Sequence, residues 1–281
     1  MGSEMVIGNK KFLLGSKTYI VGILNVTPNS FSDGGKFFDV ASAMEHVERM
    51  ISQGADIIDI GGESTKPGYK MISDDEEIER IVPVIRQIKS QFDIPISIDT
   101  YKSKVALEAI KAGADCINDI WGLKHDEKMA GLVKKYDLPV CIVHNRAQKD
   151  SSLSEDAFIL KMKEEILQSI SIAKKAGISD DKIIIDPGIG FGKTYEQNLC
   201  CVKNLSMWKE FGYPILLGAS RKSFIGEALN LPVGEREEAT IAISALAAMN
   251  GCDFLRVHDV EKNYRAVAMT KIIFGGEDKF V

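Results

Sequence analysis

The stretch QGADIIDIGG (residues 53–62) decides the fold, because it contains the end of a helix and a complete buried strand. Its Gly54 suits the left-handed position that commonly ends a helix. The residues that follow are almost continuously apolar rather than alternating, which is typical of a strand buried on both faces. The same order recurs in AGADCINDI (112–120) and NGCDFLRVHD (250–259), so the chain repeats a helix–strand unit.

The pattern extends over the whole chain. Strands are expected at residues 19–26, 56–62, 96–100, 116–120, 139–145, 183–188, 214–220 and 254–259. Helices are expected at residues 40–53, 74–91, 102–112, 126–136, 155–176, 195–211, 235–250 and 261–274. Eight such units favour an α/β fold of the closed (β/α)8 type, a TIM barrel, as a single domain over residues 1–281. An open, doubly wound sheet is the alternative.

Two further features bear on the fold and the setting. Residues 10–20, KKFLLGSKTYI, predict a short N-terminal hairpin that plugs the bottom of the barrel. No apolar run reaches the roughly 18 residues of a membrane span, and we expect neither a leader nor a membrane partner. Five cysteines without a CxxC pair indicate neither a disulfide framework nor a zinc site, so a cytoplasmic location is expected.

The composition is that of an ordinary globular protein. Of the 281 residues, 45% are hydrophobic and 27% are charged, and the formal net charge is −5. The chain has no cluster of lysine and arginine, and its mild acidity argues against nucleic acid as the main partner.

Polar residues stand at or just after the end of every expected strand. They are Asn25; Glu63, Ser64 and Thr65; Asp99; Asn118 and Asp119; His144 and Asn145; Asp186; Ser220, Arg221 and Lys222; and Arg256 with His258. The carboxyl ends of barrel strands surround the active site, so we expect one polar rim. Its acceptors Asp99, Asn118 and Asp186 suit a ligand edge rich in N–H donors. Lys222, Arg256 and His258 suit a carbonyl and phosphate oxygens.

Two short motifs near the rim need separate interpretation. GIGFGKT (188–194) fits neither the Walker pattern, because Pro187 stands where a glycine is required, nor the dinucleotide fingerprint. Its glycines are expected to bring Phe191 and Lys193 close to a ligand. SRKSFIG (220–226) predicts the start of a helix at which Ser223 would suit a carboxylate or phosphate, although Ser223 could also be a simple N-cap.

Seven segments together resemble the dihydropteroate synthase family. They are NVTPNSFSDGG, DIIDIGGESTKPG, ISIDTYKSKVA, INDIWG, IIIDPGIGFGKT, LLGASRKSFIG and RVHDV, in the family's order from about residue 19 to 260. The resemblance implies a (β/α)8 barrel that forms a homodimer. It also implies the sulfonamide-sensitive step of folate biosynthesis, in which para-aminobenzoate and 6-hydroxymethyl-7,8-dihydropterin pyrophosphate give 7,8-dihydropteroate and pyrophosphate.

The resemblance implies roles for the pterin side of the site. Asp99, Asn118, Asp186 and Lys222 would hold the pterin, and Arg256 would stack over its ring. Asn25 would ligate a Mg2+ ion bound to the pyrophosphate, a role that suits a site with few protein oxygens. Arg256 and His258 would bind phosphate oxygens. The implied mechanism is dissociative: pyrophosphate leaves first, and the neutral arylamine then attacks the pterin methylene cation.

Further implied roles concern the aminobenzoate and the loops. Ser223 would receive the aminobenzoate carboxylate, in a pocket lined by Thr65, Lys66, Pro67, Phe191 and Arg236. Phe31 and Asp33, in a lid over residues 26–36, would cover the reacting carbon and exclude water. The chain departs from the family at Asn29 and Lys66, where Asp and Arg are commoner, which we expect to tune rate or affinity.

Two other functions remain open at this point. A methyltetrahydrofolate-dependent corrinoid methyltransferase has a similar barrel and pterin-binding residues, but no use for pyrophosphate ligands such as Asn25 and His258. A non-catalytic pterin-binding barrel would have lost at least one phosphate-binding or pterin-binding residue, and none is missing here.

Overall fold

The computed structural model describes residues 4–27, 40–64 and 71–274. Eight parallel strands form one sheet in the order β8-β7-β6-β5-β4-β3-β10-β9. They are β3 (Tyr19–Asn25), β4 (Ile57–Gly61), β5 (Ile96–Asp99), β6 (Cys116–Asp119), β7 (Val140–Val143), β8 (Ile183–Asp186), β9 (Leu216–Leu217) and β10 (Phe254–Val257). Ile185 pairs with Ile215 in a parallel bridge that joins the two edges. The predicted (β/α)8 barrel is confirmed, and the open sheet is wrong.

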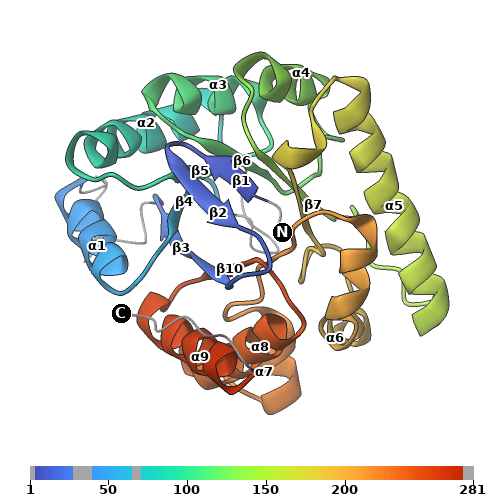
Figure 1. Cartoon of the computed structure of the whole chain (residues 1–281). Helices are drawn as coiled ribbons and strands as arrows, with labels where there is room; N and C mark the ends of the chain where they lie inside the picture. Colours follow the sequence, from blue (N-terminus) through green and yellow to red (C-terminus); the bar gives the residue numbers. More distant parts are fainter. Residues whose placement is uncertain (1–3, 28–39, 65–70, 275–281) are drawn as a thin grey trace.

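Helices surround the barrel on its outside (Figure 1). They are α1 (Val40–Ser52), α2 (Asp74–Gln91), α3 (Ser103–Ala112), α4 (Glu127–Tyr136), α5 (Glu155–Lys175), α6 (Tyr195–Lys203), α7 (Ser223–Leu229), α8 (Glu237–Met249) and α9 (Val260–Ile273). Three 3-10 turns join them to their neighbours, namely η1 (Asp180–Lys182), η2 (Leu205–Phe211) and η3 (Val233–Glu235). Gly113 ends α3 with φ 118°, as the repeated glycine predicted. No helix in the described part of the chain has the length and apolarity to cross a membrane.

The single helix expected over residues 195–211 is wrong. α6 ends at Lys203, because Asn204 leaves helical geometry with φ −106° and ψ 30°. The Asn204 side chain donates to the Cys200 carbonyl at 2.9 Å, a local bond that competes with continuation of the helix. The chain then continues as η2, which buries the ring of Trp208.

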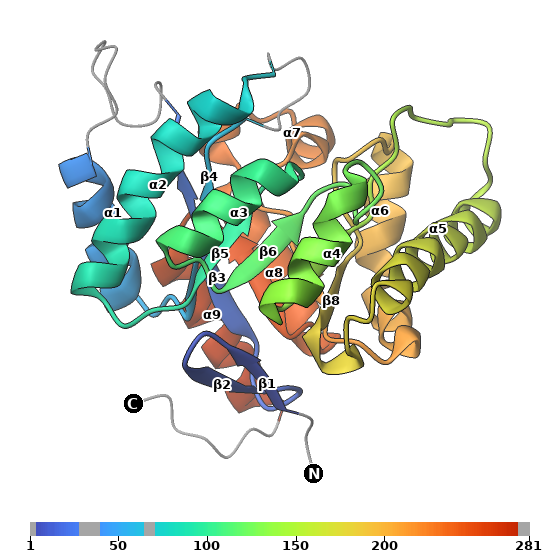
Figure 2. The same ribbon diagram turned by 90° about the horizontal axis from the view of Figure 1, so that it is seen from above.

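An N-terminal hairpin fills the amino end of the barrel, as predicted, but it is formed by residues 4–13 and not by residues 10–20. β1 (Glu4–Ile7) and β2 (Lys10–Leu13) pair antiparallel, and Figure 2 shows them at one end of the barrel. Phe12 enters the barrel, where its ring lies 4.8 Å from that of Tyr19 and 5.8 Å from that of Phe254. This interior cluster is separate from the larger core between strands and helices. Any ligand site inside the barrel therefore lies at the opposite, carboxyl end.

Candidate active site

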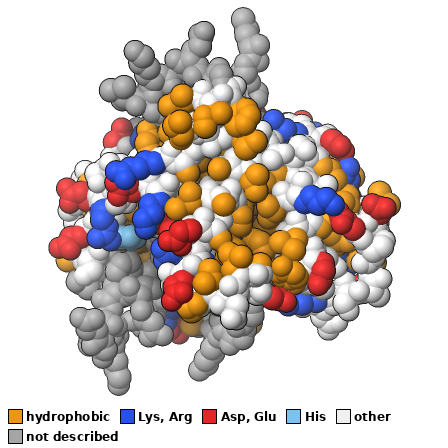
Figure 3. Space-filling view, turned by 90° about the horizontal axis from the view of Figure 1, so that it is seen from below, with side chains coloured by type: hydrophobic (Ala, Val, Ile, Leu, Met, Phe, Trp, Pro, Cys, Tyr) orange, Lys and Arg blue, Asp and Glu red, His pale blue; other side chains and the backbone are white. Residues whose placement is uncertain are grey.

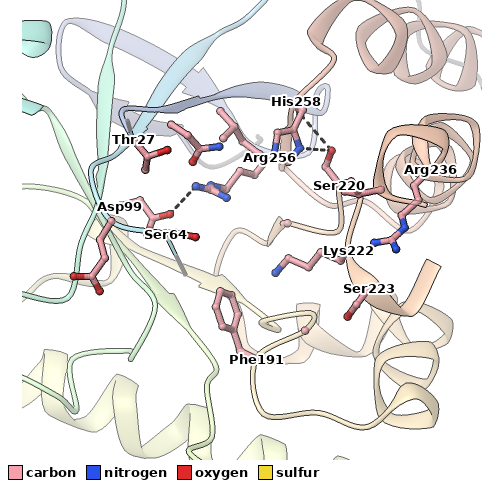
Figure 4. A pocket seen from close by; sticks show the side chains of 16 residues that line it. Thr27, Ser64, Asp99, Phe191, Ser220, Lys222, Ser223, Arg236, Arg256 and His258 are labelled. Carbon is pink, nitrogen blue, oxygen red and sulfur yellow. Dashed lines mark hydrogen bonds and ion pairs between the residues drawn. The ribbon is translucent and has the colours of Figure 1, made fainter. Parts of the chain in front are cut away.

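A cavity of about 440 Å3 lies at the carboxyl end of the barrel strands. Eight of the predicted site residues line it: Asn25, Asp99, Phe191, Lys222, Ser223, Arg236, Arg256 and His258. Figure 4 shows Lys222, Ser223 and Arg236 on one side of the cavity and Asp99 and Ser64 on the other, with Arg256 between them. Residues from distant strands thus meet around one hollow.

The guanidinium of Arg256 joins two buried carboxylates. Its Nε donates to Asp59 Oδ2 and its Nη2 to Asp99 Oδ2, both at 2.6 Å. Asn118 belongs to the same network, because its Nδ2 donates to Asp59 Oδ2 at 3.4 Å. Asp186 is close enough to Arg256 for the guanidinium charge to act on its carboxylate, and its Oδ1 accepts the Gly188 amide at 2.6 Å. The network therefore joins Arg256 directly to two carboxylates, the predicted Asp99 on β5 and the unpredicted Asp59 on β4, and to the predicted Asn118 on β6 through Asp59.

Three oxygen atoms of this network have no donor. Asp59 Oδ1, Asp99 Oδ1 and Asn118 Oδ1 are buried and accept no hydrogen bond from the part of the chain that the structure describes. A buried polar atom without a partner costs about 1–3 kcal/mol. Because all three are acceptors, the complementary group is a ligand edge with several N–H donors.

Burial changes the ionisation of the groups around the cavity. It raises the pKa of Asp99 to about 7 and also raises the pKa of Asp186, while the positive charges of Arg256 and Lys222 act in the opposite direction. Burial lowers the pKa of Lys222 to about 7, against the attraction of Asp186. Such shifts in a cleft are typical of functional sites.

Lys222 contacts the loop that carries Phe191. Its Nζ donates to the Ile189 carbonyl and lies 4.2 Å from the centroid of the Phe191 ring. Gly190, with φ 86°, leaves room for the Lys222 side chain, since a Cβ there would lie 3.1 Å from Lys222 Cδ. The aromatic ring and the ammonium group therefore form one wall of the cavity.

Ser223 and Arg236 form another part of the wall. Ser223 is the first residue of α7, and Lys222 occupies the N-cap, so the alternative that Ser223 is a simple N-cap is wrong. Arg236 donates from Nη1 to the Arg221 carbonyl and from Nε to the Leu231 carbonyl, both at 3.1 Å. It packs on Gly226, where a Cβ would lie only 2.2 Å from Arg236 Nη2.

Asn25 and His258 also line the cavity. Asn25 is the last residue of β3, and His258 Nδ1 is 2.9 Å from the hydroxyl of Ser220. No group of three or more His, Cys, Asp or Glu side chains among the described residues could hold a metal ion. A cation at Asn25 would therefore take most of its oxygen ligands from a bound molecule and from water.

Lys193, which was expected close to a ligand, and His144, which was expected on the polar rim, do not line the cavity. Lys193 is buried, and its Nζ donates to the Gly188 carbonyl at 2.8 Å and the Phe191 carbonyl at 3.2 Å. It also lies 2.9 Å from His144 Nδ1, and His144 Nε2 lies 2.8 Å from Glu165. Burial lowers the pKa of His144 to about 3 and that of Lys193 to about 8. Lys193 therefore binds its own loop rather than a ligand.

Two other strand-end residues serve local structure. Asp119 accepts the amides of Trp121 at 2.8 Å and Leu123 at 2.9 Å. Arg221 forms an ion pair with Glu237 at 2.8 Å.

Some predicted residues lie outside the described part of the chain, and one residue of the buried network was not predicted. Phe31, Asp33, Thr65, Lys66 and Pro67 lie outside the described residues, as does Asn29. Asp59 was not predicted, because it lies within a strand rather than at its end. The signal was present, since a carboxylate two residues before Gly61 on an otherwise apolar strand faces the same side as the strand end.

Comparisons with known proteins agree with this geometry. A model of the family described as pterin binding enzyme matches residues 21–258. Dihydropteroate synthase of Clostridium beijerinckii is 58% identical over 271 residues, which cover 96% of this chain and 99% of that protein. The enzyme of Bacillus subtilis is 49% identical over 254 residues, covering 90% and 87%.

Solved structures are similar over almost the whole chain. Dihydropteroate synthase of Clostridium difficile, crystallised in the presence of pteroic acid, is 48% identical with a TM-score of 0.89, covering 94% of this chain and 99% of that one. The Xanthomonas albilineans enzyme with 4-aminobenzoic acid is 34% identical with a TM-score of 0.91, covering 98% and 99%.

Proposed function

This chain belongs to the dihydropteroate synthase family of pterin-binding enzymes, and from that premise we propose that both substrates bind in the cavity at the carboxyl end of its barrel. A dihydropteroate synthase of folate biosynthesis joins para-aminobenzoate to 6-hydroxymethyl-7,8-dihydropterin pyrophosphate. The carbon–oxygen bond to pyrophosphate breaks, a carbon–nitrogen bond to the arylamine forms, and the amine loses a proton.

The observation that supports the pterin site is the set of buried oxygens without donors. Asp59, Asp99 and Asn118 each have one oxygen without a donor among the described residues, and the buried Asp186 is close enough to feel the charge of Arg256. The 2-amino group and N3–H of a pterin supply donors for such acceptors, and Lys222 supplies a donor for the ring carbonyl. When the pterin binds, Arg256 would lose its hydrogen bond to Asp99 and stack over the ring, while its Nε continues to donate to Asp59.

The second substrate would occupy the part of the cavity near α7. Ser223 and Arg236 line it and supply a hydroxyl and a cation for the aminobenzoate carboxylate. Phe191 supplies an apolar surface for the aromatic ring. This arrangement presents the amine to the pterin methylene, and holding two reactants in line removes much of the entropic barrier.

Pyrophosphate and Mg2+ would lie near Asn25, Arg256 and His258. Asn25 supplies one amide oxygen, which fits Mg2+ because this ion usually keeps several waters and binds through few protein groups plus phosphate. When bound, Mg2+ offsets negative charge on the leaving group. We expect a dissociative substitution. Arg256 and His258 would donate to the phosphate oxygens, which gain negative charge as pyrophosphate leaves. The carboxylates Asp99 and Asp186 would stabilise the positive charge that develops on the pterin.

We propose a homodimer and a cytoplasmic location as well. Apolar side chains on α8 and α9 are exposed, namely Leu246, Met249, Met269, Ile272 and Ile273. Figure 3, the face below α8 and α9 in Figure 1, shows hydrophobic side chains gathered in one patch with charged groups around it. Such a patch is typical of an interface. All five cysteines are buried thiols, which suits a reducing compartment.

The experiment supplies pterin pyrophosphate, para-aminobenzoate and Mg2+ and measures dihydropteroate and pyrophosphate. We expect the two products in equal amounts. Pterin binding without turnover would indicate a non-catalytic barrel, and methyl transfer from methyltetrahydrofolate would indicate the corrinoid-dependent enzyme. Either result would overturn the proposal.

A further inference from the structure

The turn that leads from β9 into α7 contains three residues of the cavity wall and one residue that is not part of it. Ser220, Lys222 and Ser223 line the cavity, whereas Arg221 does not. The φ angle of Arg221 is 55°, in the left-handed region that residues other than glycine seldom adopt. Such a conformation persists only where surrounding contacts hold it. The contacts of Arg221 therefore bear on how its neighbours reach the cavity.

The start of α8 holds Arg221 by its backbone and by its side chain. The Arg221 amide donates to Thr240 Oγ1, and the Arg221 carbonyl accepts from Arg236 Nη1, both at 3.1 Å. The side chain donates from Nε to Glu237 Oε2 at 2.8 Å. Glu237 and Thr240 are buried, so water competes little for these bonds. Both polar groups of the Arg221 backbone and its guanidinium are thus bound to one short stretch of chain.

Further buried bonds fix Glu237 itself. Its Oε1 accepts from Asn263 Nδ2 at 2.8 Å, and Asn263 Oδ1 accepts from the Ser244 hydroxyl at 2.7 Å. Asn263 Nδ2 also donates to the carbonyl of Asp259 at 2.7 Å, and Asp259 follows the cavity residue His258. Asn263 is completely buried. Glu237 therefore connects the turn before α7 to the connection between β10 and α9.

The two neighbours of Arg221 bind different parts of the barrel. Ser220 Oγ lies 2.9 Å from His258 Nδ1 and accepts the His258 amide at 3.3 Å. Lys222 Nζ donates to the Ile189 carbonyl in the connection between β8 and α6. Figure 4 shows Ser220 beside His258, with Lys222 and Ser223 in another part of the cavity wall. The backbone angles of Arg221 therefore set the direction of Lys222 and Ser223 relative to Ser220.

We propose that Arg221 is a positioning residue for both substrates, because its left-handed backbone, held by Glu237 and Thr240, directs Lys222 and Ser223 into the cavity. The inference rests on the proposed function, in which Lys222 binds the pterin carbonyl and Ser223 binds the aminobenzoate carboxylate. Arg221 acts only through these neighbours. The effect is geometric, since a misplacement of about 1 Å can reduce a rate by about 100-fold.

The main test compares Arg221→Ala with Arg221→Gly in steady-state kinetics. Both variants lose the ion pair to Glu237, but only glycine adopts the left-handed conformation without a steric cost. We expect KM for each substrate to rise about fivefold in Arg221→Ala and less than about twofold in Arg221→Gly. A role in stability alone would lower the amount of folded enzyme and leave both KM values unchanged.

Glu237→Gln tests the residue that holds Arg221. The variant keeps an acceptor for Asn263 Nδ2 and loses the charge that binds the guanidinium of Arg221. We expect both KM values to rise about threefold. The same substitution in the Arg221→Gly background should cause no further rise, because the partner of Glu237 is already absent there.

Asp137 provides a matched control at the other end of the barrel. It also has a left-handed backbone, with φ 52°, and an ion pair, to Lys182 at 3.3 Å. It lies between α4 and β7, before the strand rather than after it. Asp137→Ala should unfold at a lower urea concentration than Asp137→Gly, and neither variant should change either KM.

Each outcome decides the proposal. Unchanged KM values in Arg221→Ala would show a purely structural role, and equal rises in Arg221→Ala and Arg221→Gly would show that the side chain itself acts on the substrates. Either result overturns the proposal, as does a KM change in both Asp137 variants. If Arg221→Ala does not fold, Glu237→Gln with and without Arg221→Gly decides in the same way.

Failure of the proposed function would be distinguishable. If the wild type forms no dihydropteroate, the proposed function fails, and calorimetry with 6-hydroxymethyl-7,8-dihydropterin tests the placement of Lys222. Weaker pterin binding in Arg221→Ala but not in Arg221→Gly would support the positioning role without turnover. Equal Kd values in both variants, or no pterin binding by the wild type, would overturn it.

Discussion

The two oxygens of Asp99 differ in their surroundings. Oδ2 accepts from Arg256, whereas the buried Oδ1 has no donor within the described residues. Burial raises the pKa of the carboxyl to about 7, so the ligand-free enzyme holds a proton there in mildly acidic solution. A protonated carboxyl is a poorer acceptor for the donor edge of a pterin.

Pterin affinity should therefore fall as the pH falls through 7. We expect the Kd of 6-hydroxymethyl-7,8-dihydropterin, measured by calorimetry, to increase as the pH falls, by about tenfold for each pH unit below pH 6. The pterin without pyrophosphate is used so that no phosphate titrates in this range. Lys222, whose pKa is also about 7, gains a proton over the same range and should favour binding as the pH falls, so Asp99→Asn should bind more weakly at pH 8 and lack the rise in Kd at low pH. A flat wild-type profile, or an equal slope in the variant, would contradict the assignment.

The same shift has a defined effect on stability. The folded chain keeps the Asp99 proton up to about pH 7, whereas the unfolded chain loses it near its ordinary value of 3.8. The wild type therefore loses unfolding free energy relative to Asp99→Asn as the pH rises across this window. Urea titrations of both proteins at several pH values measure the difference even where the variant binds no pterin.

Individual residues also show how far the sequence could predict the site. Asn118 and Asp119 are neighbours, but Cys116 belongs to the barrel interior, so alternation directs Asn118 inward and Asp119 outward. Asp99, Asn118 and Asp186 were predicted because site residues of a barrel lie at the ends of its strands. That rule could not distinguish side chains that point into the barrel from those that point away from it. The same rule overlooked Asp59, which lies one step deeper.

At the scale of elements, the loop between β8 and α6 depends on Lys193. Its ammonium holds the Gly188 and Phe191 carbonyls, and Gly188 packs so closely that a Cβ would lie 1.8 Å from the His144 carbonyl. The glycines at φ 68°, 86° and 59° allow the loop to fold around this lysine. Phe191 is consequently presented to the cavity while Lys193 is not.

Lys193→Met should destabilise the protein and displace Phe191. Several buried carbonyls lose their donor, so we expect the free energy of unfolding to fall by roughly 3 kcal/mol, together with weaker pterin binding. Urea denaturation and calorimetry measure the two effects. Lys203→Met on the neighbouring α6, which removes only an exposed ion pair to Glu155, is the control. Weaker binding with unchanged stability would instead mean that Lys193 contacts the ligand directly.

Elements were predicted best where the apolar pattern was long. The eight strands and most helices were expected within a few residues, because continuous apolar runs and cap glycines are local signals. The split between α6 and η2 was not predicted, because residues 195–211 keep a helical pattern throughout and the break depends on the Asn204 side chain. The length of β9 depends on pairing with β10, which no local pattern reports.

At the scale of the whole molecule, the exposed patch on α8 and α9 predicts an assembly. Ile272→Asp places a charge in the proposed interface, so sedimentation should shift from about twice 30.9 kDa to a single chain at micromolar concentration. Leu160→Asp, at an even more exposed apolar site on α5, should leave the sedimentation unchanged. A wild type that already sediments as a single chain, or a dimer in Ile272→Asp, would contradict the interface.

The closed barrel could be predicted because eight units in one chain leave few other architectures. The closure itself could not be predicted, because it depends on the register between the two edge strands β8 and β9, which Ile185 and Ile215 join. A hairpin was expected before the first barrel strand, but its first strand, β1, lies ahead of the residues expected to form it, and its depth inside the barrel is known only from the contacts of Phe12.

That hairpin has a kinetic consequence. Since β1 and β2 occupy the amino end of the barrel, the interior has one entrance, and everything that enters or departs uses it. Dihydropteroate spans both substrate positions, so while it remains neither fresh substrate can be admitted. Added dihydropteroate should therefore compete with both substrates alike, which initial rates measured with added product would test.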